Sequence, residues 1–241
     1  MDLNVGEKMN SLNIYFLLFM IYSFIGWLME VCLVLIENKK LVNRGFLIGP
    51  YCPIYGVGCL LIILCLKSFA KNPIILFIMS LIICSGLEYA TSYIMEKLFN
   101  TRWWDYSNRK YNLNGRVCLS NMLAFGILGT IIIYIVNPYF MSLINMIPNN
   151  ALCPITIVLA ILFIVDNIIS FKIIYTFKDT IMSVSKDNTE EINQKVHEIL
   201  LKKTGLAKRL RKAFPNLQVR IKKTKKIIKK QVKELEKKIK G

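Results

Sequence analysis

The 241-residue chain is 54% hydrophobic and has a mean hydropathy of +0.45, which excludes an ordinary soluble domain. Its formal net charge of +17 is uneven, because residues 178–241 hold 20 of the 32 lysines and arginines. A basic tail tethered to a membrane favours lipid headgroups over nucleic acid as its partner. We therefore divide the chain into a transmembrane domain, residues 1–177, and a basic cytoplasmic tail, residues 178–241.

Five apolar runs are long enough to cross a hydrocarbon core of about 30 Å, which takes about 20 helical residues. The predicted spans are residues 11–36, 46–66, 73–98, 118–137 and 154–177. Basic residues concentrate in the loops after the first and third spans and in the tail. The positive-inside rule then places the N-terminus outside and the C-terminus in the cytoplasm. The expected fold is an all-α polytopic helix bundle in the cell (inner or plasma) membrane.

Glu30 and Glu88 each lie within an apolar span, where a carboxylate costs about 2.5–3.5 kcal/mol to insert. The loops that follow these spans carry Asn43-Arg44-Gly45 and Asn114-Gly115-Arg116. This pattern suggests two similar helical hairpins plus one further span, with chance similarity as the alternative. We expect Arg44 and Arg116 to approach the carboxylates on the cytoplasmic half. The cluster would be either a substrate or proton site or a set of structural ion pairs.

The second span begins irregularly, because Pro50 and Pro53 follow directly on Gly45 and Gly49. Proline removes backbone donors, so the freed carbonyl groups need partners within the protein or in a wet cavity. The segment is predicted to be either a kinked structural helix or a functional break. Tyr55, just beyond it, is assigned to the hypothetical polar site.

The third span is followed by Trp103-Trp104-Asp105-Tyr106. Adjacent tryptophans are typical of an anchor at the membrane interface. Asp105 either caps a turn or lines the polar site, to which Asn114 is also assigned. The fourth span is expected to end at Asn137-Pro138, leaving residues 139–147 on the outer interface. In the fifth span, Asp166 is predicted to take part in proton coupling or to be a neutral structural acid.

No metal or cofactor is expected. The seven cysteines form no CxxC or Cys/His pattern and are interpreted as reduced, apolar fillers. Walker A, HExxH and GxSxG motifs are absent from the sequence, so an enzymatic activity is not expected, and energy from ATP would have to come from another chain.

The tail after Pro215 has apolar residues spaced for a basic amphipathic helix on the inner leaflet or for a short coiled coil. These residues are Leu217, Ile221, Ile228, Val232, Leu235 and Ile239. A partly disordered, solvated tail is the third interpretation.

Three motifs in order resemble the bacterial CmpB-like family, which is labelled as type IV ABC transporters. They are Gly45-Phe46…Gly49-Pro50-Tyr51-Cys52-Pro53-Ile54-Tyr55-Gly56, Trp103-Trp104-Asp105-Tyr106-Ser107 and Asn112-Leu113-Asn114-Gly115-Arg116. The resemblance covers roughly residues 11–140 and implies a multi-pass permease whose substrate is unknown. Such a permease would need a separate ATPase subunit and self-association into a homo-oligomer.

Two other functions remain open. The alternative is a non-transporting membrane scaffold or a protein that binds lipid headgroups. The third is a lipid-modifying enzyme that uses Glu30 or Glu88 as its acid or base.

Overall fold

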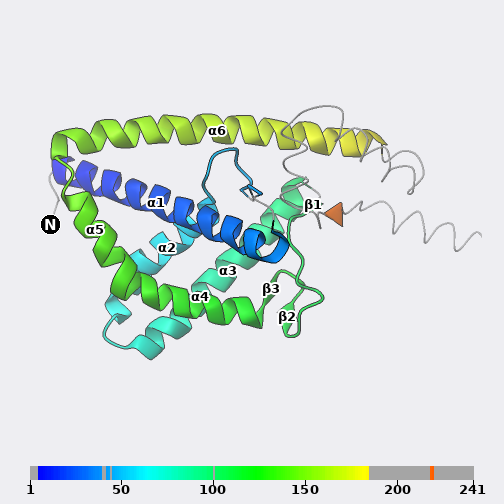
Figure 1. Cartoon of the computed structure of the whole chain (residues 1–241), viewed down its shortest axis with the longest axis horizontal. Coiled ribbons are helices and arrows are strands. Elements are labelled where there is room, and N and C mark those ends of the chain that lie inside the picture. The colour runs from blue at the N-terminus through cyan, green and yellow to red at the C-terminus, as the bar shows by residue number, and fades with distance from the viewer. Residues whose placement is uncertain (1–4, 40–41, 44, 100, 185–217, 220–241) are drawn as a thin grey trace, which may run out of the picture.

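The computed structural model describes residues 5–39, 42–43, 45–99, 101–184 and 218–219, and these residues are mostly helical (Figure 1). The helices are α1 (Val5–Asn38), α2 (Pro53–Leu66), α3 (Pro73–Phe99), α4 (Leu119–Ile131), α5 (Asn137–Asn145) and α6 (Asn149–Val184). A 3-10 turn, Lys67–Phe69, extends α2, and a π-helical turn, Ile132–Val136, joins α4 to α5.

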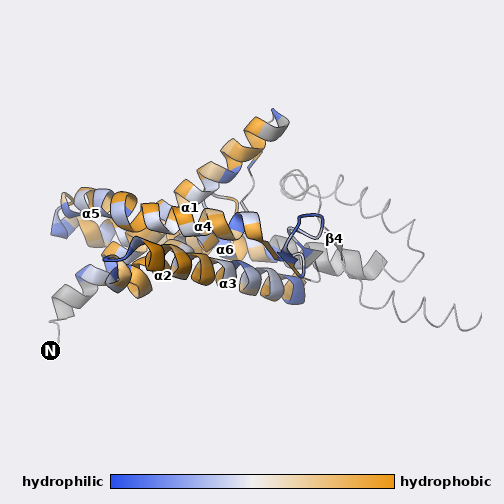
Figure 2. Cartoon of the chain, turned by 90° about the horizontal axis from the view of Figure 1, so that it is seen from below, coloured by the Kyte–Doolittle hydropathy of each residue, from blue (hydrophilic) through white to orange (hydrophobic). Residues whose placement is uncertain are grey.

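Four helical stretches among the described residues are long and apolar enough to cross a membrane. They are Asn10–Ile36, Pro73–Phe99, Leu119–Asn145 and Asn149–Lys172. Their outward faces are also apolar, as Ile157, Val158 and Ile161 on α6 illustrate, each more than half exposed. Figure 2 shows the same pattern, with hydrophobic residues along the helices and hydrophilic residues in the connecting segments. Because so broad an apolar surface suits lipid and not water, the chain is a multi-pass membrane protein.

The helices pack as neighbouring pairs. α1 lies against α2 and also runs beside α6, while α3 lies against α4, and α2 joins the pairs by packing on α3 (Figure 1). Both hairpins place a serine of the first helix against a glycine of the second. A Cβ on Gly56 would collide with the Ser23 hydroxyl, and a Cβ on Gly129 would collide with Ser80. Small residues permit such close helix contact in membranes, and the repeated contact suits two similar hairpins.

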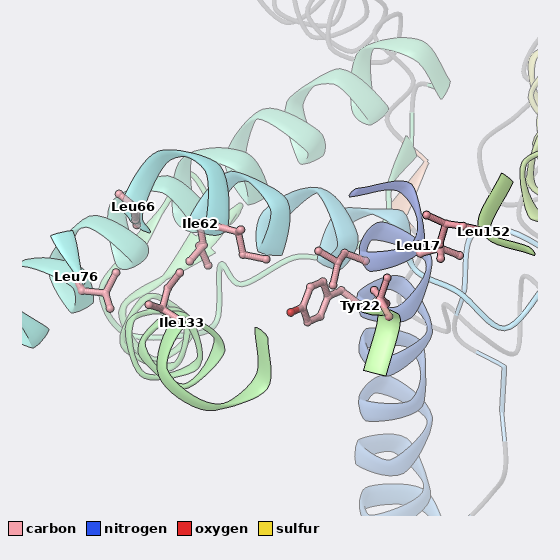
Figure 3. Packing of buried hydrophobic residues seen from close by; sticks show 10 residues of the cluster. Leu17, Tyr22, Ile62, Leu66, Leu76, Ile133 and Leu152 are labelled. Carbon is pink, nitrogen blue, oxygen red and sulfur yellow. The ribbon is translucent and has the colours of Figure 1, made fainter. Parts of the chain in front are cut away.

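An apolar core fixes the end of the bundle that holds the α2–α3 connection. Its buried side chains come from α1, α2, α3, the π-turn, α5 and α6 (Figure 3). Residues labelled in Figure 3 include Leu17, Tyr22, Ile62, Leu66, Leu76, Ile133 and Leu152. At the other end a smaller aromatic cluster surrounds Phe99 and Trp103. Along α3, Glu88 lies between these two apolar regions.

The fourth span is longer than predicted. The helix does not end at Asn137-Pro138, and α5 continues the span to Asn145, so residues 139–145 are part of a spanning helix. Pro138 has no N–H to donate to a carbonyl group in the preceding turn. The wider π-turn just before it accommodates this missing hydrogen bond, and the Tyr22 hydroxyl donates to Asn137 Oδ1 at 3.2 Å.

The second predicted span is not one continuous helix. Residues 45–52 are irregular, and helix α2 begins only at Pro53, so its 14 residues cover less than a full bilayer crossing. The segment is therefore a break and not a kinked helix, while a functional role for the break stays a prediction. Backbone of this kind needs partners inside the protein, and the Cys52 N–H donates to the Ser23 carbonyl of α1 at 2.8 Å.

Short strands complete the described structure. β2 (Asn112–Leu113) pairs antiparallel with β3 (Val117–Cys118), and β1 (Thr101–Arg102) pairs antiparallel with β4 (Gln218–Val219). β4 lies within the stretch predicted to form the amphipathic tail helix, so that prediction fails for these two residues. The rest of the predicted tail helix lies outside the described residues.

Candidate functional site

One face of α3 carries a line of polar side chains. Ser85, Glu88 and Ser92 are buried, and the mostly buried Glu96 follows one turn later. Their spacing of three or four residues places them above one another on the helix. α3 therefore presents two carboxylates, about 12 Å apart along the axis at 1.5 Å per residue, to the interior of the bundle.

Glu88 forms part of a cluster that draws on several segments. The Tyr106 hydroxyl donates to Glu88 Oε1 at 3.1 Å, and the Tyr55 hydroxyl donates to Glu30 Oε1 at 2.7 Å. Glu30 also lies within electrostatic range of both Glu88 and Tyr106. The two hairpins thus contribute one carboxylate each to a shared carboxylate–tyrosine cluster, formed by Glu30, Tyr55, Glu88 and Tyr106.

Tyr106 reaches this cluster from the loop between α3 and α4. Burial raises the pKa of its phenol, and ionisation of the neighbouring Glu88 or Glu30 carboxyl would raise that pKa further. Tyr106 therefore stays protonated at neutral pH and remains a hydrogen-bond donor to Glu88.

Arg116 pairs with Glu96 and not with Glu88. Its Nη2 lies 2.8 Å from Glu96 Oε2, and its Nη1 donates to Ser92 Oγ at 3.0 Å. Its guanidinium also lies over the Tyr89 and Tyr93 rings, at 5.6 and 5.4 Å from their centroids. The planar guanidinium of Arg116 therefore makes two directed polar contacts at its edge and stacks near aromatic faces at the same time.

A second arginine extends this ion pair into a network. Arg102 lies 3.3 Å from Glu96 Oε2 and 3.1 Å from Asp105 Oδ1, and its side chain is only 4% exposed. Two arginines and two carboxylates therefore balance in charge. The Arg102–Glu96–Arg116 network, completed by Asp105, ties the end of α3 to the loop that follows it.

Asp105 caps a turn within this loop. Its Oδ1 accepts hydrogen bonds from the Ser107 N–H at 3.0 Å and the Ser107 hydroxyl at 2.5 Å. Burial alone would raise the pKa of Asp105, but the bonds from Ser107 and the charge of Arg102 outweigh it and hold that pKa below its usual value. Of the two predicted roles, the observed contacts are those of a turn cap and ion-pair partner.

The Asn114-Gly115 turn directs Arg116 inward. Both residues have positive φ, +54° and +67°, and the Arg116 N–H closes the turn on the Leu113 carbonyl at 3.0 Å. Asparagine and glycine tolerate this conformation best. A Cβ at position 115 would also collide with Asp105 and Ser107, so both the positive φ and the close packing require glycine. The Asn114 amide donates to the Tyr89 hydroxyl at 3.0 Å and lies on the loop surface.

Asp166 lies apart from this cluster and holds the irregular segment 45–52. Its carboxylate accepts hydrogen bonds from the N–H groups of Ile48 at 3.0 Å and Gly49 at 2.7 Å. The hydroxyls of Tyr51 and Ser170 donate to it at 2.5 and 2.8 Å. Four donors suit an ionised carboxylate that accepts at both oxygens, which favours a charged structural acid over a neutral one.

The predicted site residues therefore divide into three groups. Glu30, Tyr55 and Glu88 meet, whereas Arg116, Asp105 and Asn114 stabilise the neighbouring loop and Asp166 anchors segment 45–52. Arg44 lies outside the described residues. Sequence reasoning missed Tyr106, Glu96 and Arg102 as partners. The spacing of Glu96 eight residues after Glu88 was an available signal for a shared helical face.

The buried Trp103 is not a lipid-facing anchor, whereas an interface role for the half-buried Trp104 stays a prediction. Trp103 is buried among Phe46 and Phe99, and Trp104 Nε1 donates to the Arg116 carbonyl at 3.1 Å. Among the described residues, no group of three or more histidine, cysteine, aspartate or glutamate side chains could hold a metal ion.

A family model described as "Putative ABC-transporter type IV" matches residues 17–171, so the chain belongs to this CmpB family. The match covers the carboxylate–tyrosine cluster, the ion-pair network and Asp166. Neither the curated proteins nor the solved structures include a significant match.

Proposed function

We propose that this member of the family is the permease subunit of a transporter and that its solute binds at the carboxylate–tyrosine cluster. One observation carries the proposal: Glu30 and Glu88 come from different hairpins and lie within electrostatic range of each other inside an apolar bundle. Ionisable groups at membrane depth are costly to bury and mark substrate or ion pathways in membrane proteins. Because the cluster lies where the hairpins meet, a movement of one hairpin against the other would open or close it.

The proposed subunit has five crossings, with the N-terminus outside and the C-terminus in the cytoplasm of the cell membrane. Segment 45–52 and α2 together supply the crossing that no continuous spanning helix provides. The α3–α4 loop carries Arg102, Arg109, Lys110 and Arg116, whereas the α2–α3 connection carries Lys67 and Lys71. The positive-inside rule then places the carboxylate–tyrosine cluster on the cytoplasmic half.

The proposed transporter requires other chains. We propose that the subunit is not itself an enzyme, that a separate ATPase hydrolyses ATP for it, and that it self-associates. The family to which it belongs supports an ATPase partner. A motif that binds nucleotide is not found in this chain's sequence.

Transport by inside-out vesicles from the native host tests this proposal. ATP should drive movement of at least one solute in a mass-spectrometric panel, relative to vesicles that lack the chain. Glu88→Gln should abolish the movement, because it removes a charge from the solute site. Ile157→Ala, a change on the lipid-facing side of α6, should leave it intact. Equal movement with wild-type and Glu88→Gln chains would contradict the assigned site.

The same vesicles test the orientation. The tail should face the medium, so added protease should remove a C-terminal tag. Protection of the tag from protease would contradict the proposed orientation. Both readouts are compared at equal protein abundance on immunoblots.

One observation favours a lipid-binding function as the second candidate. An open hollow of about 530 Å³ is lined by Arg109, Lys110 and Tyr111 of the loop and by Leu119 and Leu123 of α4. Cationic groups beside lipid-facing leucines suit an anionic headgroup and its acyl chain. Absence of any chain-dependent solute movement, with anionic phospholipid retained on the purified protein, would favour this candidate over transport.

A further inference from the structure

Glu88 contains a buried oxygen atom that has no hydrogen-bond partner. The residue is only 8% exposed, and while Oε1 accepts from Tyr106, Oε2 has no partner within the described part of the chain. Asn121 of α4 interacts with the same carboxyl, but Oε2 keeps no hydrogen-bond partner. An ionised carboxylate buried in this way lacks the donors that would offset its desolvation.

A second buried oxygen without a hydrogen-bond partner lies one turn earlier on the same helix. Ser85 precedes Glu88 by one turn on the same face of α3, is 8% exposed, and its hydroxyl also has no partner among the described groups. Two adjacent buried oxygens without partners are unusual, since the large majority of buried polar atoms are satisfied. Both oxygens can accept hydrogen bonds, so a ligand that brings hydrogen-bond donors or positive charge would satisfy them together.

The described groups around Glu88 supply no cation. Those that interact with it are neutral or acidic: Glu30 from α1, Tyr106 from the loop, Asn121 from α4 and Cys84 from its own helix. Arg116 is already engaged by Ser92, one turn after Glu88 on α3, and by Glu96. The charge of Glu30 opposes a second negative charge at Glu88. The surroundings therefore favour either a protonated Glu88 or a bound cation beside it.

We propose that Glu88 holds a proton in the resting protein and exchanges it for a small cation that carries N–H donors, an ammonium-type group, at Oε2 and Ser85 Oγ. The proton leaves Oε2 for water as one positive charge arrives, so the charge of the site is conserved. This inference deepens the proposed function by naming the class of solute. The cation must be small, because Glu88 is only 8% exposed.

Labelling with dicyclohexylcarbodiimide tests the protonated state. This reagent partitions into membranes and reacts with protonated carboxyl groups, so peptide mass spectrometry of the full chain should find Glu88 modified at neutral pH. Asp166 and Glu96 serve as internal controls, because the first accepts four hydrogen bonds and the second pairs with two arginines. Glu30→Gln should slow the labelling several-fold, since it removes the charge that opposes ionisation of Glu88.

The exchange is tested by competition at constant ionic strength. Ammonium chloride should slow the labelling of Glu88 several-fold, whereas tetramethylammonium chloride, which has the same charge but no N–H donor, should not. Ser85→Ala should weaken the protection by ammonium while leaving the labelling itself in place.

Three results would overturn the inference. They are an unmodified Glu88, modification of Glu88 no faster than that of Asp166 and Glu96, and labelling that ammonium does not slow. Labelling and protection without solute movement would remove the transport function and retain the cation site. Solute movement with an unreactive Glu88 would retain the transport function and remove the cation site.

Discussion

Asp166→Asn should destabilise the protein more than any other single change in segment 45–52 or its partners. The carboxylate accepts two backbone and two hydroxyl hydrogen bonds, while an asparagine has one oxygen and turns its NH₂ group toward donors. At least two buried donors would lose their partners, at about 1–3 kcal/mol each, so we expect a loss of about 2–6 kcal/mol. Denaturant unfolding of the purified protein in detergent measures it.

Ser170→Ala is the matched control for this prediction. It removes one of the four donors and leaves the carboxylate and the backbone bonds in place, so it should cost only about 0.5–1.5 kcal/mol. If Asp166→Asn were no worse than Ser170→Ala, then Asp166 would not anchor the segment as a charged acceptor. A neutral acid would explain such a result.

Arg116→Gln should have an effect of similar size. The change leaves Glu96 without its closest cation, 2.8 Å away, in a position where the Glu96 side chain is only 14% exposed. Breaking one side of a buried ion pair costs about 3–5 kcal/mol, which for a chain of this size lowers the melting temperature by roughly 6–20 °C. Differential scanning fluorimetry of the purified protein would detect such a shift.

Two further variants separate geometry from charge. Arg116→Lys keeps the charge but cannot reach Ser92 and Glu96 together, so it should fall between wild type and Arg116→Gln. Arg109→Gln removes an exposed cation of the same loop and should change stability by less than about 0.5 kcal/mol. Equal melting temperatures for Arg116→Gln and Arg109→Gln would show that the ion-pair network is not a stabilising feature.

Several features of the fold followed from local sequence. Long apolar runs located the first and third spans to within one residue, since span length depends on bilayer thickness. The fourth span ends eight residues later than predicted, and the fifth begins five residues earlier. Pro50 and Pro53 correctly marked the irregular start of the second span. Pro138, by contrast, was a misleading signal, because a π-turn five residues long lets the helix continue through it.

The candidate site was only partly predictable, because its contacts join distant segments. Glu30 and Glu88 were identified since carboxylates inside apolar spans are rare. The local sequence pattern could not predict that Arg116 pairs with Glu96, because the inward direction of Arg116 depends on the positive-φ turn at Asn114 and Gly115. Nor could it connect Asp166 to Gly49, which lies 117 residues earlier in the chain.

The central claim is that the two hairpins share one carboxylate–tyrosine cluster, and photo-cross-linking tests it directly. p-Benzoylphenylalanine is placed at Tyr106, with a protease site inserted after Lys71 in the exposed α2–α3 connection. After irradiation and cleavage, a cross-link from position 106 to α1 or α2 keeps the two halves together on a denaturing gel. The same substitution at Tyr111, which is 79% exposed, is the control.

We predict that the two halves stay joined when the cross-linker is at position 106 and separate when it is at position 111, with adducts mapping near Glu30 and Tyr55. Complete separation of the halves with the cross-linker at position 106, in a protein that still folds, would contradict a shared site.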